Sequence, residues 1–272
     1  MNSDPRDYWE GADRFLDLYP LDGEGDKLSL VKALLERFTH LPYENLSKII
    51  KLHRAGPEIR PPLEVVEDHQ AWGLGGTCFS LTFLLQTILS RWGIPSYPVM
   101  SDVSWGKDTH TCLVAKIVRR RYLLDPSYLL HLPLELAPDR EQMVDVGFSS
   151  MGLRFDPGSG YYNLFTYNQG ETKWRYRFRD LPIHLDDFLR RWRSSFSWKG
   201  MKGICLTHLT SEGLYYLHND FIRRTNRQGR RNYKLKGEHR VVEEVFGIKG
   251  EILEEAREIL RRGQSIVQTG PG

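Results

Sequence analysis

Three residues whose types suit nucleophilic catalysis follow one another along the chain in the order cysteine, histidine, aspartate: Cys78, His110 and Asp125. A cysteine thiolate can attack a carbonyl carbon, an imidazole can accept or donate the proton, and a carboxylate can orient the imidazole. Asp125 follows His110 by fifteen residues. This combination predicts acyl-transfer or hydrolytic chemistry, on condition that the fold brings the three side chains together.

Cys78 lies at the predicted start of a buried helix. Thr77 is a residue type favoured at the N-cap, and Gly75 and Gly76 before it permit a tight turn into the helix. A thiol in the first helical turn feels the positive end of the helix dipole, which favours the thiolate. The alternative is a structural thiol, because buried cysteine is common. The helix is predicted over 78–92 from apolar residues at helical spacing: Leu81, Leu84, Leu85, Ile88, Leu89 and Trp92.

His110 and Asp125 lie on the two strands of a predicted β-hairpin. Residues 109–118 (THTCLVAKIV) form the first strand and residues 122–125 (YLLD) the second, with a basic turn at 119–121. A turn in this position places Asp125 within a couple of residues of the point opposite His110, where a carboxylate can orient an imidazole. A lone histidine on a strand is more often structural, but such a hairpin downstream of Gly-Gly-Thr-Cys is a narrower pattern.

Asp145 competes with Asp125 for the role of the acid. It stands in the run Val-Asp-Val-Gly-Phe, and His131 precedes it by fourteen residues. We prefer His110 and Asp125, because two clear strands flank them, whereas His131 is predicted to lie in a Pro-rich link.

The composition indicates an ordinary globular protein of 272 residues, with 40% hydrophobic and 27% charged residues. A net charge of +3 is too small to imply nucleic-acid binding. The N-terminus shows no signal pattern, and no apolar run approaches the roughly 20 residues that span a bilayer. Three cysteines do not suggest a disulfide framework, so a cytoplasmic location is predicted. Cys112 and Cys205 stand on predicted strands, and core positions are expected for both.

The pattern of apolar residues changes near residue 94. Residues 6–93 are predicted to be mainly helical, with irregular links at 42–46 and 53–62. Short strands separated by frequent turns then indicate an antiparallel, barrel-like sheet. Besides the hairpin above, the predicted strands are 97–103, 143–148, 153–155, 161–167 and 172–178. A short helix at 186–193 follows, and the last third combines a hairpin (204–210 with 214–217) with helices at 238–245 and 251–262.

These motifs, in this order, resemble those of the arylamine N-acetyltransferase family. Pro42-Tyr43-Glu44-Asn45-Leu46 is similar to its Pro-Phe-Glu-Asn-Leu element, and Leu74-Gly75-Gly76-Thr77-Cys78 to its Arg-Gly-Gly-x-Cys. His110 and Asp125 keep the fifteen-residue interval of its histidine and aspartate. The resemblance implies an α+β fold around a papain-like or transglutaminase-like Cys-His-Asp core. Its three parts would be an N-terminal helical bundle (1–93), a central antiparallel β-barrel (94–200) and a C-terminal α/β lid (201–272).

The resemblance also implies a ping-pong acyl transfer. Cys78 would take the acyl group, His110 would relay the proton, and Asp125 would fix the imidazole. Acetyl-CoA or another acyl-CoA would be the co-substrate, and an arylamine- or hydrazine-like amine the acceptor. No metal, permanently bound cofactor, nucleic acid or membrane partner is expected, and the oligomeric state is left open.

Supporting roles around Cys78 follow from the same resemblance. Glu44 and Asn45 would brace the cysteine loop, and backbone groups at Gly76 and Phe79 would lie near the oxyanion of the reaction. Three aromatic residues are left open between a role in the acceptor pocket and a role in the core: Tyr43, Phe79 and Tyr128.

Several positions differ from the family pattern. Leu74 replaces the arginine before the two glycines, so Glu44 is expected to lack its partner. Ser80 replaces an acidic residue, and Pro126-Ser127-Tyr128 replaces Gly-Phe-Gly. The basic run 223–236 is predicted to be either a solvated surface or a contact for the phosphates of coenzyme A. Two other functions stay open: a hydrolase or amide synthase that uses the same three residues, and a non-catalytic binding protein.

Overall fold

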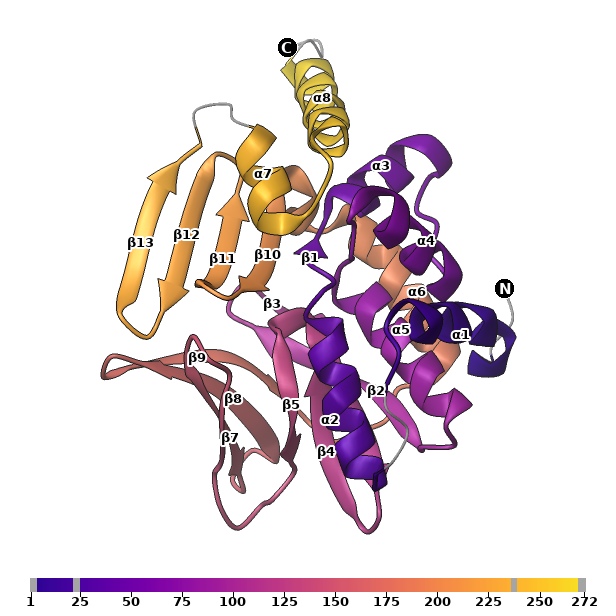
Figure 1. The fold of residues 1–272 in the computed structure, drawn as a ribbon, viewed down its shortest axis with the longest axis vertical. Coiled ribbons are helices and arrows are strands. Elements are labelled where there is room, and N and C mark those ends of the chain that lie inside the picture. Colours follow the sequence, from indigo (N-terminus) through magenta and orange to yellow (C-terminus); the bar gives the residue numbers. More distant parts are fainter. Residues whose placement is uncertain (1–3, 22–24, 236–238, 269–272) are drawn as a thin grey trace.

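The computed structural model describes residues 4–21, 25–235 and 239–268, which form helices and two antiparallel sheets (Figure 1). Its α-helices are α1 (Trp9–Leu18), α2 (Lys27–Phe38), α3 (Leu46–Ala55), α4 (Pro62–Trp72), α5 (Cys78–Arg91), α6 (Leu185–Ser194), α7 (His239–Phe246) and α8 (Gly250–Gln268). The short 3-10 helices are η1 (Pro5–Tyr8), η2 (Pro126–Tyr128), η3 (Ser195–Ser197) and η4 (Lys199–Lys202). Within these ranges no helix has both the length and the apolar character needed to cross a bilayer.

The strands divide between a large sheet and a small one. The large sheet contains β2 (Ser96–Val103), β3 (Gly106–Ile117), β4 (Arg120–Asp125), β5 (Leu130–Glu135), β6 (Gln142–Asp145), β7 (Ser150–Asp156), β8 (Tyr161–Asn168) and β9 (Glu171–Phe178). The small sheet contains β1 (Tyr43–Glu44), β10 (Cys205–Thr210), β11 (Gly213–His218), β12 (Phe221–Asn226) and β13 (Gly229–Lys234).

Helix α5, which carries Cys78 at its first position, is the centre of the helical part. Every side chain from Cys78 to Leu89 is buried, because α1, α4, β2 and β3 all pack against this helix. A largely apolar helix without a polar face needs such surroundings on all sides. The helix predicted from Cys78 onward is confirmed, although the side chain of Thr77 at the N-cap makes no capping hydrogen bond.

The large sheet is an almost closed antiparallel barrel, as predicted. Its strand order is β5-β4-β3-β2-β9-β8-β7-β6, and the two end strands β5 and β6 approach each other. The predicted hairpin around residues 168–170 is confirmed as β8 and β9. Its two turn residues, Gln169 and Gly170, both have positive φ angles (51° and 77°), which is the backbone of a two-residue turn that follows the twist of the strands.

Some predicted boundaries are wrong. His131, expected to lie in a Pro-rich link, stands in strand β5 (Leu130–Glu135). Pro133 is tolerated there because β5 is the last strand of its sheet, where a missing N–H donor costs little. The turn expected at 119–121 consists of Val118 and Arg119 alone. Helix α3 reaches Ala55, into the stretch expected to be a loop.

The small sheet joins the beginning of the chain to its end. Strand β1 pairs with β10, so that Tyr43 lies opposite Thr207 and Glu44 opposite Leu206. Figure 1 shows this sheet beside the helical part, with α7 packed across β10 and α8 against α3. The division into parts 1–93, 94–200 and 201–272 stays a prediction, but the residues next to the cysteine loop take part in the C-terminal sheet.

Candidate active site

The loop before Cys78 requires glycine at position 75, where a backbone carbonyl approaches closely, and leaves little room for a side chain at position 76. A Cβ atom on Gly75 would lie 2.0 Å from the carbonyl oxygen of Pro42, and one on Gly76 would lie 2.1 Å from Oγ of Ser80. Gly76 N donates to Pro42 O (3.2 Å), and Glu44 N donates to Gly76 O (3.0 Å). The segment 42–44 therefore runs along the cysteine loop and fixes it. Cys78 follows with 7% of its surface exposed.

His110 and Asp125 meet across the β3–β4 hairpin. Leu113 pairs with Leu124, so Asp125 lies diagonally opposite His110, two residues from its direct partner position, as predicted. Nε2 of His110 donates to Oδ2 of Asp125 at 2.8 Å. The other oxygen, Oδ1, accepts from Ser127 Oγ (2.7 Å) and Tyr128 N (3.2 Å). Asp125 is completely buried, and these three hydrogen bonds fix the orientation of its carboxylate.

The charges of the three residues support one another. Burial by itself lowers the pKa of His110, but the charge and hydrogen bond of Asp125, followed by the hydrogen bond and charge of Cys78, overcome this and raise the pKa to about 10. His110 is therefore an imidazolium at neutral pH, placed between a carboxylate and the sulfur. The structure thus brings Cys78, His110 and Asp125 together. The sequence predicted their chemistry only if the fold did so.

The competing residues lie elsewhere or are chemically unsuited. Cys112 is completely buried beside Ser101, and burial raises the pKa of its thiol well above the usual value. Burial also raises the pKa of Cys205, to about 11. Asp145 is 68% exposed and forms an ion pair with Arg227 in the turn between β12 and β13, while its competing partner His131 acts on it through its charge. Neither thiol is a suitable nucleophile at neutral pH, because the thiolate is the reactive form.

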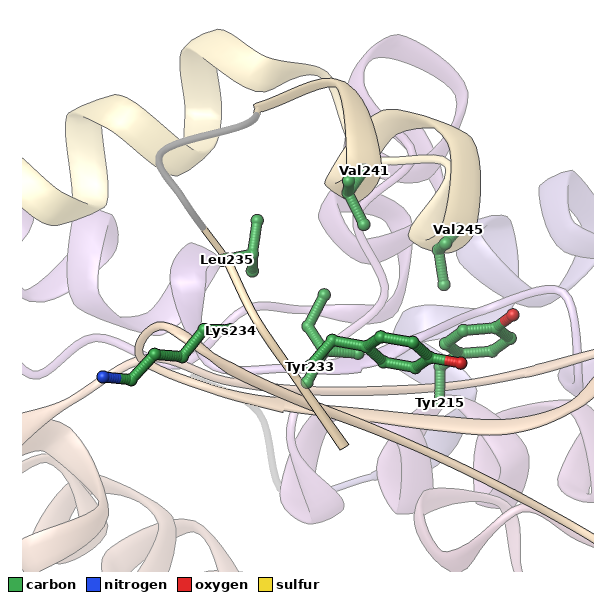
Figure 2. A pocket seen from close by; sticks show the side chains of 7 residues that line it. Tyr215, Tyr233, Lys234, Leu235, Val241 and Val245 are labelled. Carbon is green, nitrogen blue, oxygen red and sulfur yellow. The ribbon is translucent and has the colours of Figure 1, made fainter. Parts of the chain in front are cut away.

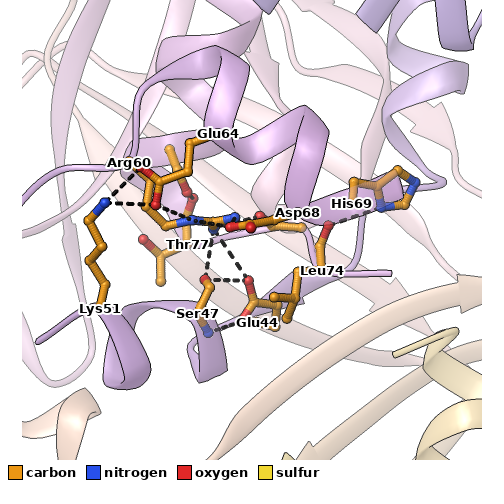
Figure 3. Close-up of polar contacts among 11 residues, drawn as sticks. Glu44, Ser47, Lys51, Arg60, Glu64, Asp68, His69, Leu74 and Thr77 are labelled. Carbon is orange, nitrogen blue, oxygen red and sulfur yellow. Dashed lines mark hydrogen bonds and ion pairs between the residues drawn. The ribbon is translucent and has the colours of Figure 1, made fainter. Parts of the chain in front are cut away.

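Glu44 has a partner after all, which corrects the expectation from Leu74. Arg60, in the loop before α4, is 4% exposed and places Nη1 3.7 Å from Oε1 of the completely buried Glu44. The same Nη1 donates to Gly75 O (3.0 Å) and to Ser47 Oγ (2.7 Å). Figure 3 shows this network. A guanidinium from a different point in the sequence thus braces both Glu44 and the cysteine loop.

We predict that Arg60→Ala lowers the free energy of unfolding by about 3–5 kcal/mol at pH 7.5, because it leaves the carboxylate of Glu44 buried without its counter-charge. Burial already raises the pKa of Glu44, against the effects of Arg60 and Ser47. A carboxyl group whose pKa is raised in the folded state lowers the free energy of unfolding when the pH is above that folded-state pKa. Below the unfolded-state pKa of 4.5 it has no such effect. The loss should therefore be smaller at pH 5 than at pH 7.5, as measured by urea unfolding.

Arg54→Ala is the matched control for Arg60→Ala. Arg54 forms an ion pair with Glu255, but its side chain is 65% exposed, and such pairs contribute at most about 1 kcal/mol. Equal losses for the two variants would contradict the proposed bracing role of Arg60.

Asn45 contacts the C-terminal part of the chain and not the cysteine loop. Its Nδ2 donates to the carbonyl oxygens of Gly200 (2.9 Å) and Gly203 (2.7 Å), and its Oδ1 accepts from Cys205 N (2.8 Å). The amide therefore ties the start of α3 to residues 200–205. Of the two residues expected to brace the loop, Glu44 alone makes a direct bond to it.

The three aromatic candidates occupy different places. Tyr128 lies edge-on to His110 with ring centroids 5.1 Å apart. Burial is the main cause that raises the pKa of the Tyr43 hydroxyl, followed by the charges of Cys205 and Cys78. Tyr43 is therefore close to Cys78. Phe79 is 1% exposed and packs into an aromatic cluster with α6 and the segment after it. Its ring neighbours in that cluster are Phe188, Trp192 and Trp198.

Two surface hollows lie away from these residues. One is an apolar groove of about 370 Å³ between β11–β13 and α7, lined mainly by tyrosine, valine, leucine and isoleucine side chains (Figure 2). The other has a mainly acidic lining from α1 and α4. Neither is lined by Cys78, His110 or Asp125, so we do not connect them with the reaction.

Cys78, His110 and Asp125 come together where α5 packs against the barrel strand β3, an arrangement that suits catalysis by a cysteine nucleophile. A family model described as N-acetyltransferase matches residues 28–253. The chain belongs to this family, that of the arylamine N-acetyltransferases, and is an enzyme of that class. No curated protein sequence gives a significant match to it.

Solved structures of arylamine N-acetyltransferases share the fold. The enzyme from Nocardia farcinica superposes with a TM-score of 0.77 at 20% identity, covering 96% of this chain and 100% of its own. The Mycobacterium abscessus enzyme gives 0.76 at 20% identity, over 92% and 96% of the two chains. An enzyme from Bacillus cereus, described as having a unique Cys-His-Glu catalytic triad, gives 0.71 at 16% identity, over 88% and 99%.

Proposed function

We propose that the protein transfers an acyl group from a coenzyme A thioester to an amine through an acyl-enzyme on Cys78. The observation that supports this most directly is the 2.8 Å bond between His110 and Asp125, beside a cysteine at the start of a buried helix. The imidazolium of His110 stabilises the thiolate, which is the attacking form of cysteine. Family membership supports acetyl as the acyl group and an arylamine as the acceptor.

The start of α5 supplies donors for the developing oxyanion. The first intrahelical hydrogen bond runs from Leu81 N to Thr77 O, so the N–H groups of Cys78, Phe79 and Ser80 have no acceptor within the helix. Donors in such a position typically contribute about 3 kcal/mol each to stabilisation of the transition state. The thioester carbonyl would point its oxygen toward these groups while the sulfur attacks its carbon.

Four cations on β9 and the small sheet suit the phosphates of the donor. Lys173 and Arg175 on β9 lie close to Arg223 and Arg230 of the small sheet, and the charge of Arg175 lowers the pKa of Lys173. Arg230 pairs with Glu171 at 2.8 Å. Across the described parts of the chain, no carboxylate forms an ion pair with the other three. Arg175 in turn is close enough to Tyr128 for their charges to interact, which links the cations to the ring beside His110.

We predict that the double substitution Lys173→Ala/Arg223→Ala raises KM for acetyl-CoA roughly tenfold or more, since each charge-assisted phosphate contact contributes about 1.5–3 kcal/mol. The KM for S-acetyl-N-acetylcysteamine, a thioester without phosphates, should stay unchanged. Arg224→Ala is the matched control, because Arg224 is adjacent in β12, points to the opposite face and pairs with Glu212. An equal rise in KM for both donors would show that these cations do not bind phosphate.

The test of the function itself is a panel of acyl-CoA thioesters with and without amines. Transfer predicts that added arylamine or hydrazine speeds the release of coenzyme A and that the acyl group appears on the amine. Release at the same rate without amine would instead indicate a hydrolase that uses the same three residues. No release from any thioester by folded protein would exclude both.

A further inference from the structure

A histidine in the last turn of α4 makes a direct hydrogen bond to the cysteine loop. The Nδ1 atom of His69 lies 2.9 Å from the carbonyl oxygen of Leu74, as Figure 3 shows. Between them, Gly73 ends the helix with a positive φ angle of 73°, and its N–H donates to His69 O at 2.9 Å. The imidazole is thereby placed against the first carbonyl of the loop that leads to Cys78.

The carbonyl of Leu74 is the first of three consecutive carbonyls that accept hydrogen bonds from other elements. Gly75 O accepts from Arg60 Nη1 and Gly76 O accepts from Glu44 N, each at 3.0 Å. Glycine has little conformational preference of its own, so donors from outside the loop decide its geometry. Leu74 is 4% exposed, and a buried carbonyl that loses its donor is costly. The histidine is therefore one of three groups that fix the loop.

The second ring nitrogen of His69 shows which tautomer makes this bond. Nδ1 must carry a hydrogen to donate to a carbonyl, and Nε2 lies 2.6 Å from the hydroxyl oxygen of Tyr19, which can donate to its lone pair. The Tyr19 ring contacts Phe15 and stacks on His40, with ring centroids 5.2 Å and 4.9 Å apart. Burial lowers the pKa of His69, opposed by the bond to Leu74, so the ring is neutral at neutral pH.

We propose that His69 is a positioning residue of the active site, whose Nδ1–H fixes the cysteine loop and through it the place of the Cys78 sulfur beside His110. It contacts neither the sulfur nor a substrate, and acts through the backbone between Leu74 and Cys78. For the acyl-transfer reaction this inference rests on the proposed function. The position of the sulfur beside the imidazolium can be tested without any acyl donor.

Loss of the His69 donor should separate the sulfur from the imidazolium for part of the time. The peptide at Leu74 can then rotate to give its carbonyl another partner, because the two following residues, Gly75 and Gly76, adapt at little cost. Cys78 away from His110 is an ordinary thiol with a pKa of about 8.5, largely protonated at lower pH. Alkylation of Cys78 below that pH therefore reports how well the loop is positioned.

Alkylation by iodoacetamide is measured on the full chain at pH 6.5 and pH 8.5, and mass spectrometry counts the modified Cys78. His69→Leu removes the donor, and its rate should fall about tenfold at pH 6.5, the effect of one hydrogen bond to a buried group. The fall should be much smaller at pH 8.5, where an unpaired thiol ionises by itself. A merely structural loss would expose the thiol and raise both rates. Either that result or a wild-type rate at pH 6.5 would overturn the proposal.

Two amide variants distinguish the donor from the rest of the ring and keep the test available if His69→Leu folds poorly. His69→Asn places its amide nitrogen where Nδ1 lies and should stay within about twofold of the wild-type rate at pH 6.5, whereas His69→Gln places it at the level of Nε2 and should lose rate as His69→Leu does. Equal rates for the two amides would contradict the proposal.

His208→Leu is the matched control. His208 on β10 also donates through Nδ1 to a carbonyl, that of Val245 on α7, at 2.9 Å, but this carbonyl is outside the cysteine loop. The variant should keep the wild-type alkylation rates, and a tenfold fall at pH 6.5 would contradict a specific role for His69.

Turnover separates this proposal from the proposed function. If both hold, release of coenzyme A from acetyl-CoA by His69→Leu should fall in the same proportion as its alkylation at pH 6.5. If the alkylation rates follow the expected order while no variant, nor the wild type, turns over a thioester, the positioning role of His69 stands and the proposed function fails.

Discussion

Replacement of Cys78 by alanine is expected to lower kcat for acyl transfer by at least about 10⁴-fold, because no other group in the site can form the acyl-enzyme. Cys78 is 7% exposed and its side chain is small, so the substitution removes little packing and the fold should survive. Wild-type protein incubated with acetyl-CoA in the absence of amine should carry one acetyl group on Cys78. The measurement is intact-protein mass spectrometry followed by peptide mapping, alongside the rate of coenzyme A release.

The other two cysteines provide the controls. Cys112→Ala and Cys205→Ala remove thiols whose pKa is raised by burial, and both variants should keep the acetyl adduct and most of the rate. Cys78→Ser is a second test, because serine keeps the volume but is a weaker nucleophile without a strong base. An acetyl group on Cys112 or Cys205, or a Cys78→Ala enzyme with wild-type turnover, would contradict the assignment of the nucleophile.

The part of this site that could be predicted from the sequence is the part set by local geometry. A helix start follows from Gly75, Gly76 and the apolar spacing after Cys78, and the register of a short hairpin is fixed by its turn. The turn proved one residue shorter than predicted, yet Asp125 still came within two residues of the position opposite His110. Such features depend on neighbours in sequence, so patterns reveal them.

The burial of Arg60 and Lys48 could not be predicted, because only tertiary packing produces it. Arg60 stands in a stretch with glycine and three prolines that resembles an exposed loop, and its partner Glu44 lies on β1. Lys48 stands in a short helix with polar residues on several sides, where an exposed lysine is the normal expectation. It is buried because the segment after α6, more than 140 residues away, packs over it. Leu74 in place of an arginine suggested that Glu44 has no cationic partner, but Arg60 is that partner.

Asp125→Asn should lower kcat by about 10⁴-fold, the loss seen when the carboxylate that orients a catalytic imidazole is replaced by an amide. In the wild type, Asp125 is the main reason that the pKa of His110 rises to about 10 in spite of burial. Without that charge, burial lowers the pKa of His110 and only Cys78 opposes this effect, so the imidazolium is less stable at neutral pH. The measurement is the rate of Cys78 alkylation by iodoacetamide between pH 5 and 9. Alkylation should stay fast down to low pH in the wild type, whereas in Asp125→Asn the rate at pH 7 should fall at least about tenfold.

Asp145→Asn is the matched control for this substitution, because Asp145 is the competing aspartate and its side chain is 68% exposed. It should leave both kcat and the alkylation profile at wild-type values. Circular dichroism and urea unfolding must show that Asp125→Asn is folded, since the carboxylate also accepts hydrogen bonds from Ser127 and Tyr128. A folded Asp125→Asn enzyme with the wild-type pH profile would mean that His110 does not depend on this carboxylate. A loss of activity in Asp145→Asn alone would assign the acid to the other pair of residues.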